Sequence, residues 1–503
     1  MRKRLFNEIL MARERVYAMF DPTPLEPLAL AGMDCKVFIK REDLSPIHSY
    51  KWRGAYNRMA ILSAEERRRG VVCASAGNHA QGVAAAAHKM GIQATIYMPR
   101  STPRMKQAAV AHFGGNHTKV VLFGDQYSQA AEEAARVCRE ETGTFIHPYN
   151  DLLTMGGQGT LADEIVMSGR GPFDIAYVQI GGGGMASSVA CWLKTYYPGI
   201  RIVGVEGDGQ ACMTAAIRAG KPVELDYVDV FADGTAVRKA GSRTYPLCRD
   251  LIDEFITVSN EELCAAIQIL WESVRCIPEP SGVMGLAGLL KQKARITRCR
   301  AICIISGSNL DFGQLPYIAR HAGIGASRWR YFQFEIEERG GSLLALLETI
   351  SGANIVEMQY GKTSPTHAWP VIGLEASPME LDVITQLLTD CGIPFKDVTG
   401  QQDVEFRIIH YEPDLFQNPY LFRIEFPERA GALRDFMRQV KDIANMCYFN
   451  YVTSGERIGR ALLGFEFESE ERRNRFLHIL NNCGLTHQEI TPEALNRILG
   501  TTG

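Results

Sequence analysis

The sequence predicts an α/β protein in two parts, with parallel strands in the N-terminal part and a duplicated α/β plan in the C-terminal part. Up to about residue 320, apolar runs alternate with helix-length segments. After about residue 325, strand-like segments alternate apolar with polar residues, and the pattern returns roughly ninety residues later. A chain of 503 residues is too long for one hydrophobic core, so we expect separate domains.

The N-terminal strands are continuous apolar runs rich in β-branched residues. This composition is typical of parallel strands that are buried on both faces. An alanine-rich helix follows the first run, and Gly91 marks its expected end. The predicted strands cover residues 71–74, 94–98, 175–180, 202–205 and 302–305.

The C-terminal part is an internal repeat. Residues 331–337 predict a half-buried strand, and the same strand pattern returns at Phe422. Each copy predicts the order strand, helix, strand, strand, helix, strand, which is the ferredoxin-like plan. We therefore expect one domain over residues 1–325 and two smaller units over 329–400 and 419–494. The matched positions include Gly341 with Gly431, Leu343 with Leu433, Asn354 with Asn445, Tyr360 with Tyr451 and Gly373 with Gly464.

Composition excludes several classes of function. The net charge of −3 does not favour nucleic acid or an anionic membrane, and no apolar stretch approaches the length of a membrane span. The thirteen cysteines show no metal-type spacing, which indicates reduced core thiols in a cytoplasmic protein without a metal site.

Three predicted strands end in small or polar residues, at residues 75–79, 181–185 and 306–309. In open α/β sheets, ligands bind beyond the carboxyl ends of the strands, so these segments point at one ligand. Four consecutive glycines at 181–184 suit backbone amides that wrap an anion, and a helix that starts near Met185 would add its positive end. The turn after residue 74 offers amides for a carboxylate, although a plain helix cap at Ser75 or Asn78 fits its spacing as well.

Two readings of these segments stay open on the residues alone. Gly181, Gly183 and Ala186 fit a dinucleotide-binding pattern, and Glu206 lies where a ribose-binding acid would be, so this segment supports an NAD enzyme equally well. Lys51 lies between Tyr50 and Trp52, an apolar wall that would lower the pKa of its amine. A single lysine is nevertheless usually a solvated surface group.

Together the segments resemble the motifs of fold-type II pyridoxal-phosphate enzymes, whose catalytic domain has two open α/β subdomains. Residues 49–55 (SYKWRGA), preceded by KRED at 40–43, resemble the cofactor-lysine motif. Residues 75–82 resemble the substrate-carboxylate loop, 181–185 the phosphate cup and 306–309 the pyridine-nitrogen segment. Residues 147–150, 157–160 and 279–282 match as well. Over nearly its whole length the chain is similar to biosynthetic threonine deaminases, which carry two C-terminal ACT-like units.

The resemblance implies roles for individual residues. Lys51 would carry pyridoxal 5'-phosphate as a Schiff base and take the Cα proton, and Asn78 would bind the phenolic oxygen of the ring. Ser75, with Gly77 and the amides of Asn78 and His79, would hold the substrate carboxylate. The phosphate would be bound by Gly181, Gly182, Gly183, Gly184 and Met185, and the ring nitrogen would face Ser306. Because the Ser306 hydroxyl is a weak acid, it would leave that nitrogen neutral, which favours elimination over transamination.

The resemblance also implies an activity and its regulation. The expected reaction converts L-threonine to 2-oxobutanoate and ammonia, with L-serine converted to pyruvate, as the first step of isoleucine biosynthesis. Isoleucine would inhibit a homotetramer and valine would oppose it. The candidate effector residues are Gly341, Leu343, Asn354, Gly431, Leu433 and Asn445.

Three rival functions remain. A serine dehydratase or serine racemase of the same fold is one, but racemases carry a second serine where this chain has Ala76, which has no proton to exchange. An NAD-dependent dehydrogenase is another, and a yellow protein colour lost on borohydride treatment would exclude it. The third is an amino-acid sensor with an inert catalytic half, and intact Lys51, Ser75, Asn78 and Ser306 argue against it.

Overall fold

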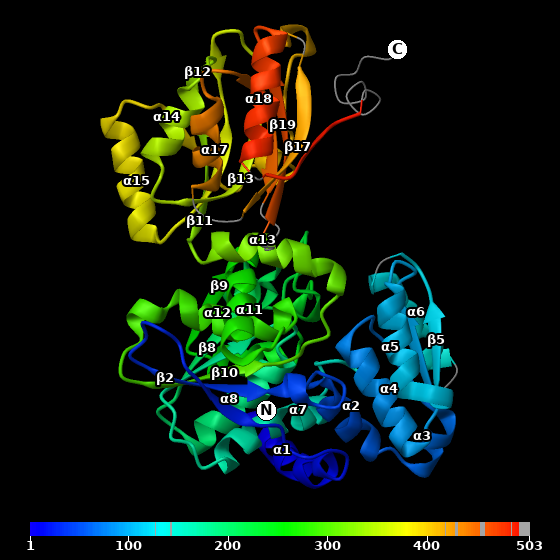
Figure 1. Ribbon diagram of the computed structural model, residues 1–503. Helices are drawn as coiled ribbons and strands as arrows, with labels where there is room; N and C mark the ends of the chain where they lie inside the picture. The colour runs from blue at the N-terminus through cyan, green and yellow to red at the C-terminus, as the bar shows by residue number, and fades with distance from the viewer. Residues whose placement is uncertain are drawn as a thin grey trace. The chain divides into compact units, whose positions relative to one another are not determined.

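The computed structural model describes residues 1–125, 127–140, 143–417, 419–427, 431–452, 458–483 and 485–491. The chain divides into two compact units, Met1–Gly325 and Ala326–Gly503, and Figure 1 shows helices packed on strands in each. Within the described part, no helix is long and apolar enough to cross a membrane, and no group of three potential metal ligands is present. All thirteen cysteines are free thiols.

A six-stranded sheet organises the first unit, with neighbouring strands in the order β1-β2-β10-β7-β8-β9. Every neighbouring pair is parallel except β1 with β2. Side chains of β7 and β10 enter two different apolar clusters, one on each face of the sheet. The predicted burial on both faces is therefore confirmed. The strands are β1 (Leu25–Leu28), β2 (Lys36–Arg41), β7 (Ile175–Gln179), β8 (Arg201–Gly207), β9 (Glu254–Val258) and β10 (Arg300–Ile305).

Helices cover both faces of this sheet and so complete its two apolar clusters. The cluster on one face includes side chains of α1 (Arg2–Tyr17), α7 (Leu152–Met167), α8 (Gly184–Tyr196), α9 (Cys212–Ala219) and α10 (Thr244–Leu251). The cluster on the other face includes side chains of α11 (Asn260–Val274), α12 (Pro280–Lys291) and α13 (Leu315–Gly325).

A four-stranded parallel sheet, in the order β5-β4-β3-β6, forms a second subdomain of the first unit. Its strands are β3 (Val71–Ala74), β4 (Ala94–Met98), β5 (Thr118–Leu122) and β6 (Thr144–Phe145), and its helices are α2 (Lys51–Ala60), α3 (Ala64–Arg69), α4 (Asn78–Met90), α5 (Arg104–Gly114) and α6 (Tyr127–Glu140). α4 ends at Gly91 in the left-handed conformation, as the sequence predicts. Because α2 packs against both α4 and α7, it joins the two subdomains (Figure 1).

The second unit contains one eight-stranded antiparallel sheet, in the order β16-β11-β15-β13-β18-β19-β17-β20. Both repeats follow the predicted strand, helix, strand, strand, helix, strand order. The first consists of β11 (Trp329–Phe334), α14 (Ser342–Thr349), β13 (Asn354–Gly361), β15 (Val371–Glu375), α15 (Pro378–Asp390) and β16 (Phe395–Asp397). The second consists of β17 (Tyr420–Pro427), α17 (Ala432–Val440), β18 (Asn445–Val452), β19 (Ile458–Glu466), α18 (Glu470–Asn482) and β20 (His487–Glu489).

The two repeats meet along β13 and β18 in a register with two-fold symmetry. Gln359 pairs with Asn450, and these two residues are equivalent positions of the repeats. Met358 pairs with Tyr451, and the equivalent pair Tyr360 and Phe449 lies on the other side of the centre. Each strand also has an irregularity at the same place, between residues 355 and 357 in β13 and between 446 and 448 in β18.

One predicted strand is wrong in extent. Residues 331–337 do not form a single strand: β11 ends at Phe334, and β12 (Ile336–Glu337) pairs separately with β14 (His367–Ala368). The break lies opposite Pro370, whose carbonyl accepts the N–H of Phe334 but whose nitrogen has no proton to donate. At the other end of the repeat region, residues 492–494 lie outside the described residues.

Candidate active site

A cavity of about 490 Å³ lies in the first unit, beyond the carboxyl ends of β7 and β10. These two strands are adjacent and parallel, so their ends meet at one edge of the sheet. The predicted residues of the lysine, phosphate and ring-nitrogen segments therefore come together, although they are far apart in the chain. The lining residues are Tyr50, Lys51, Asn78, Tyr149, Gln179, Gly181, Gly182, Gly183, Gly184, Met185, Ala186, Gly234, Thr235, Val237, Glu279, Ser281 and Ser306.

The glycine turn between β7 and α8 has no room for side chains. A Cβ at Gly182 would lie 2.3 Å from the ring of Tyr149, and one at Gly183 would lie 2.6 Å from Met213. Gly183 also has a φ of +91°, which side-chain-bearing residues rarely adopt. Because α8 begins at Gly184, its unpaired N–H groups and positive end lie at the cavity wall, an arrangement suited to an anion such as a phosphate.

Lys51 is the first residue of α2 and is half-buried at the cavity. Its Nζ lies 5.2 Å from the ring centroid of Tyr50, which also lines the cavity. The expected apolar wall is therefore only half correct. Trp52 is fully buried in a separate cluster, edge-on to Phe20 at 4.9 Å, because successive residues of a helix point in different directions.

Buried ion pairs anchor the first turn of α2. Arg53 donates to Glu42 at 2.8 Å and to Glu164 at 2.9 Å, and Lys40 donates to Glu164 at 2.6 Å. These side chains are at most 4% exposed, so removing one partner would leave a buried charge without compensation. The KRED segment that accompanies the lysine motif thus holds the helix that carries Lys51.

The loop from β3 to α4 reaches the cavity through Asn78. Ser75, Gly77 and His79 are not among the lining residues and lie on the adjoining turn. The first bond of the helix runs from Gln81 to Gly77, so the amides of Asn78 and His79 have no acceptor within the helix. The Ser75 hydroxyl accepts the N–H of Gly77 at 3.2 Å, which shapes the turn.

His79 is buried and electrically neutral. Its Nε2 lies 2.8 Å from the carbonyl oxygen of Ile146, so this nitrogen carries the proton and donates. Burial, together with the nearby charge of Lys51, lowers the pKa of His79 to about 3. The imidazole therefore packs the loop, and only the backbone amide of His79 is free for a ligand.

Ser306 is almost fully buried and lines the cavity at the end of β10. Its N–H donates to the carbonyl of Gly282 at 3.2 Å, and its own carbonyl accepts the N–H of Tyr50 at 3.1 Å. These bonds tie the ring-nitrogen segment to the start of α2, so Ser306 and Lys51 keep their places relative to one another.

The acid that would bind a ribose in the NAD reading has another role. Glu206 accepts the N–H groups of Met213 and Thr214, both at 2.8 Å, and the Thr214 hydroxyl. It therefore caps α9 and has no free oxygen directed at a ligand. Burial raises the pKa of Glu206 to about 7. The match of this segment to the dinucleotide-binding pattern is therefore coincidental, because the acid that the pattern requires caps a helix.

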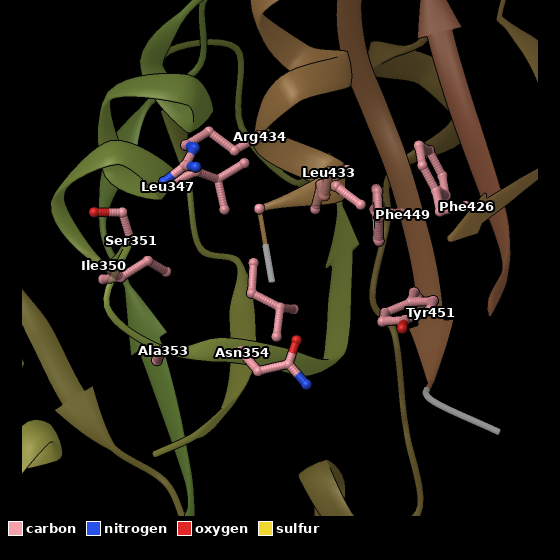
Figure 2. Close-up of a pocket in the computed structure, with 13 residues that line it drawn as sticks. Leu347, Ile350, Ser351, Ala353, Asn354, Phe426, Leu433, Arg434, Phe449 and Tyr451 are labelled. Carbon is pink, nitrogen blue, oxygen red and sulfur yellow. The ribbon is translucent and has the colours of Figure 1, made fainter. Parts of the chain in front are cut away.

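The candidate effector residues line two cavities of the second unit, of about 660 and 410 Å³. The larger cavity takes Asn354 from the first repeat and Gly431 and Leu433 from the second (Figure 2). In the smaller cavity the repeats exchange these parts: Asn445 of the second repeat lines it together with Gly341 and Leu343 of the first. Each cavity thus joins the turn of one repeat to the asparagine of the other.

The two cavities differ in charge. Arg434 lines the larger cavity (Figure 2). The equivalent position of the first repeat is Leu344. Glu338 lines the smaller cavity, where it accepts from Asn445 at 3.0 Å and from the Tyr360 hydroxyl. Burial raises the pKa of Glu338.

Several cavity residues were not predicted individually. Tyr149 packs on the glycine turn, and Thr235 and Ser281 form a hydroxyl pair at 3.1 Å in the cavity wall. Glu279 accepts from Asn78 at 2.6 Å. Tyr149, Glu279 and Ser281 lie in segments 147–150 and 279–282, so those matching strings were the available signal. Thr235 had no such signal.

Comparison with known proteins identifies both parts of the chain. Residues 18–307 match the family described as pyridoxal-phosphate dependent enzyme, and residues 415–498 match the C-terminal regulatory domain of threonine dehydratase. The chain is 36% identical to L-threonine dehydratase biosynthetic IlvA of Haemophilus influenzae, over 93% of this chain and 91% of that protein. The Escherichia coli protein of the same name is 35% identical, over 91% of this chain and 90% of its own length.

Solved structures agree with this result. The processed form of threonine deaminase isoform 2 from Solanum lycopersicum superimposes with a TM-score of 0.60 at 37% identity, covering 64% of this chain and 94% of that one. Maize serine racemase superimposes with a TM-score of 0.57 at 32% identity, covering 63% and 97%. The chain therefore belongs to the pyridoxal-phosphate dependent enzymes and, within them, to the biosynthetic threonine dehydratases.

Proposed function

We propose that this chain converts L-threonine into 2-oxobutanoate and ammonia, and L-serine into pyruvate, in the first step of isoleucine biosynthesis. One observation carries the proposal: the Lys51 amine and the glycine turn of α8 line the same cavity. The names of the relatives supply the substrate, and the chain spans nine-tenths of their length.

The cavity fits pyridoxal phosphate. A Cβ at Gly182 or Gly183 would collide with Tyr149 or Met213, so the turn carries no side chains and presents helix amides to a phosphate. Lys51 supplies the primary amine that an aldehyde requires, and Ser306 offers a hydroxyl to the ring nitrogen. When bound, the cofactor supplies an electron sink for the electrons of the Cα–H bond.

Different groups of the chain carry out the remaining parts of the reaction. Lys51 Nζ takes the Cα proton, and the amides of Asn78 and His79, with Ser75, hold the substrate carboxylate. The neutral imidazole of His79 cannot compete as an acid, because its proton is already donated to Ile146. Ser306 keeps the ring nitrogen unprotonated, which favours loss of the β-hydroxyl.

The structural likeness to a serine racemase does not extend to the residue that a racemase uses. Position 76 is alanine, on the turn between β3 and α4, so no side-chain proton is available from that position. We expect negligible formation of D-serine or D-threonine, measured by chiral chromatography of the reaction mixture. Substantial D-amino acid would contradict the assignment of Lys51 as the only base at Cα.

Residues 1–325 catalyse the reaction, and the units over 329–400 and 419–494 bind the effectors. Apolar side chains such as Leu433 and Phe449 suit the aliphatic chain of isoleucine, and Arg434 suits its carboxylate. Isoleucine inhibits the enzyme by binding in these cavities, and valine opposes this inhibition. The assembly is a homotetramer, which light scattering measures.

The deciding assay follows 2-oxobutanoate from L-threonine, with and without isoleucine. We expect a yellow protein, turnover of threonine, and loss of turnover as isoleucine is added. A colourless protein without turnover contradicts the catalytic assignment. Activity that does not respond to isoleucine contradicts only the regulatory one.

A further inference from the structure

We propose that Glu279 and Asn309 are positioning residues that orient the carboxamide of Asn78 so that one of its N–H groups points into the cavity. The inference rests on the proposed function, because the group that receives this N–H is the phenolic oxygen of pyridoxal phosphate. Neither Glu279 nor Asn309 takes part directly in the proposed reaction. They act on the ligand only through Asn78.

The polarity of this chain of hydrogen bonds is set at its far end by a backbone group. The carbonyl of Ile47 can only accept, so the Asn309 atom that lies 2.9 Å from it is the amide nitrogen. The second N–H of Asn309 donates to Asn78 Oδ1 at 2.7 Å. The nitrogen of Asn78 must therefore face the other way.

Glu279 holds that other side. Asn78 Nδ2 donates one hydrogen to Glu279 Oε1 at 2.6 Å, which leaves its second hydrogen for the cavity that Asn78 lines. A flipped carboxamide would place its oxygen against the carboxylate oxygen and its nitrogen against the Asn309 nitrogen. While Glu279 is ionised, both contacts would be repulsive, and Asn78 and Glu279 are only 8% and 4% exposed, so water cannot relieve them.

The backbone leaves space for this arrangement at Gly307. A Cβ there would lie 2.7 Å from Glu279 Oε1, so a larger residue would displace the carboxylate. The N–H of Glu279 also donates to the Gly307 carbonyl at 3.2 Å. Glu279 is thus held by the same loop that carries Ser306.

Charged groups from three other elements face Glu279. Burial and Asp233 of the segment Asp233–Thr235 disfavour its ionisation. The hydrogen bond from Asn78, together with Lys106 of α5 and Lys51 of α2, favours it. Asp233 and Lys106 form an ion pair with each other. Together these effects raise the pKa of Glu279 to about 7, with burial the largest. Its charge therefore changes near neutral pH, beside the donor that the ring oxygen requires.

Glu206 provides a matched control. It is also a buried glutamate of the first unit whose pKa burial raises to about 7. Its partners are Met213 and Thr214 at the start of α9, and it does not line the cavity. Replacing Glu206 changes a buried carboxyl of the same kind without touching Asn78.

The test uses the full chain reconstituted with pyridoxal phosphate. Glu279→Leu and Asn309→Leu should each raise the dissociation constant of the cofactor about tenfold, the size of one hydrogen bond to a charged or polar partner. Glu279→Gln still offers an oxygen to Asn78, so it should bind the cofactor like the natural chain. In the natural chain, the absorbance of the cofactor should change with a midpoint near pH 7 as Glu279 ionises. The Glu279→Gln side chain cannot titrate, so this change should disappear. Glu206→Leu and Glu206→Gln should leave both quantities unchanged.

The outcomes separate the inference from the function on which it rests. A natural chain that binds no pyridoxal phosphate refutes the proposed function. A natural chain that binds it, with Glu279→Leu and Asn309→Leu no weaker than Glu206→Leu, refutes the positioning role. An absorbance midpoint that is the same in Glu279→Gln and the natural chain refutes it as well. Thermal unfolding of each variant identifies any that fail to fold, and Glu279→Gln then carries the test.

Discussion

The cavity of the first unit and the two cavities of the second unit are built in different ways. The first is assembled once, and Lys51, Asn78 and Ser306 each supply a different chemical group from a different element. Each cavity of the second unit joins a glycine-containing turn of one repeat to an asparagine of the other. A substitution in the first unit therefore removes a group that has no copy, whereas one in the second leaves an equivalent group in place.

The largest effect is expected at Lys51. Lys51→Ala should abolish the yellow colour and lower turnover of L-threonine by at least about a thousandfold, because both the attachment of the cofactor and the base at Cα are lost. Absorbance and 2-oxobutanoate formation measure the two effects. Near-normal turnover in this variant would show that the cavity is not the catalytic site.

The glycine turn should be the next most sensitive position. Gly183→Ala places a side chain at a φ of +91° and against Met213, so it should destabilise the fold by about 1–3 kcal/mol and weaken cofactor binding. Gly199→Ala is the control, since a Cβ there meets nothing within 4 Å. Chemical unfolding and cofactor titration compare the two variants. Equal stability and equal cofactor affinity would contradict the role of the glycine turn in binding the phosphate.

The cross-repeat construction predicts which effector residues act together. Asn354→Ala and Leu433→Ala should each shift the isoleucine concentration for half inhibition by about tenfold, within the usual range of allosteric coupling. Because Asn354 and Leu433 line one cavity, the double variant should be non-additive. Asn354→Ala with Leu343→Ala, which belong to one repeat but different cavities, should be additive. The reverse result would place each site within a single repeat.

The smallest effect concerns Glu206, a buried glutamate of the first unit. The pKa of Glu206 is raised from 4.5 to about 7 in the folded chain, so between these values the folded chain binds more protons than the unfolded one. The free energy of unfolding therefore falls as pH rises through this window. Glu206→Gln should make the free energy of unfolding less dependent on pH, as measured by urea unfolding at pH 5 and 7.5. An unchanged pH dependence would show that Glu206 ionises normally.

Sequence reasoning could predict the site where local pattern and topology agree. Parallel strands place their carboxyl ends on one edge, so the segments that follow β7 and β10 had to meet, and they do. The lining wall around Lys51 was less predictable, because the direction of Trp52 depends on packing against Phe20 rather than on its neighbour in sequence. Ser75 and His79 likewise lie on the same loop as Asn78, but only Asn78 lines the cavity.

The features of the site that the sequence could not predict depend on contacts between segments that are distant in the chain. Nothing local to Asn78 indicates Glu279 or Asn309, because each belongs to an element whose approach depends on how the subdomains pack. The repeat alignment found the effector candidates but did not indicate which of them line the same cavity. The pairing of β13 with β18 exchanges the partners and places Asn354 beside Leu433.

The central register of the eight-stranded sheet has a consequence for any shortened form of this protein. Gln359 and Asn450 meet at a two-fold axis, so the sheet is joined in the way that two copies of one repeat would join. A chain that stopped before β17 would expose the hydrogen-bonding edge of β13, with half of each cavity missing. Such a fragment would be expected to pair with its own copy through that edge and so rebuild, from two chains, the two cavities that the intact protein forms within one.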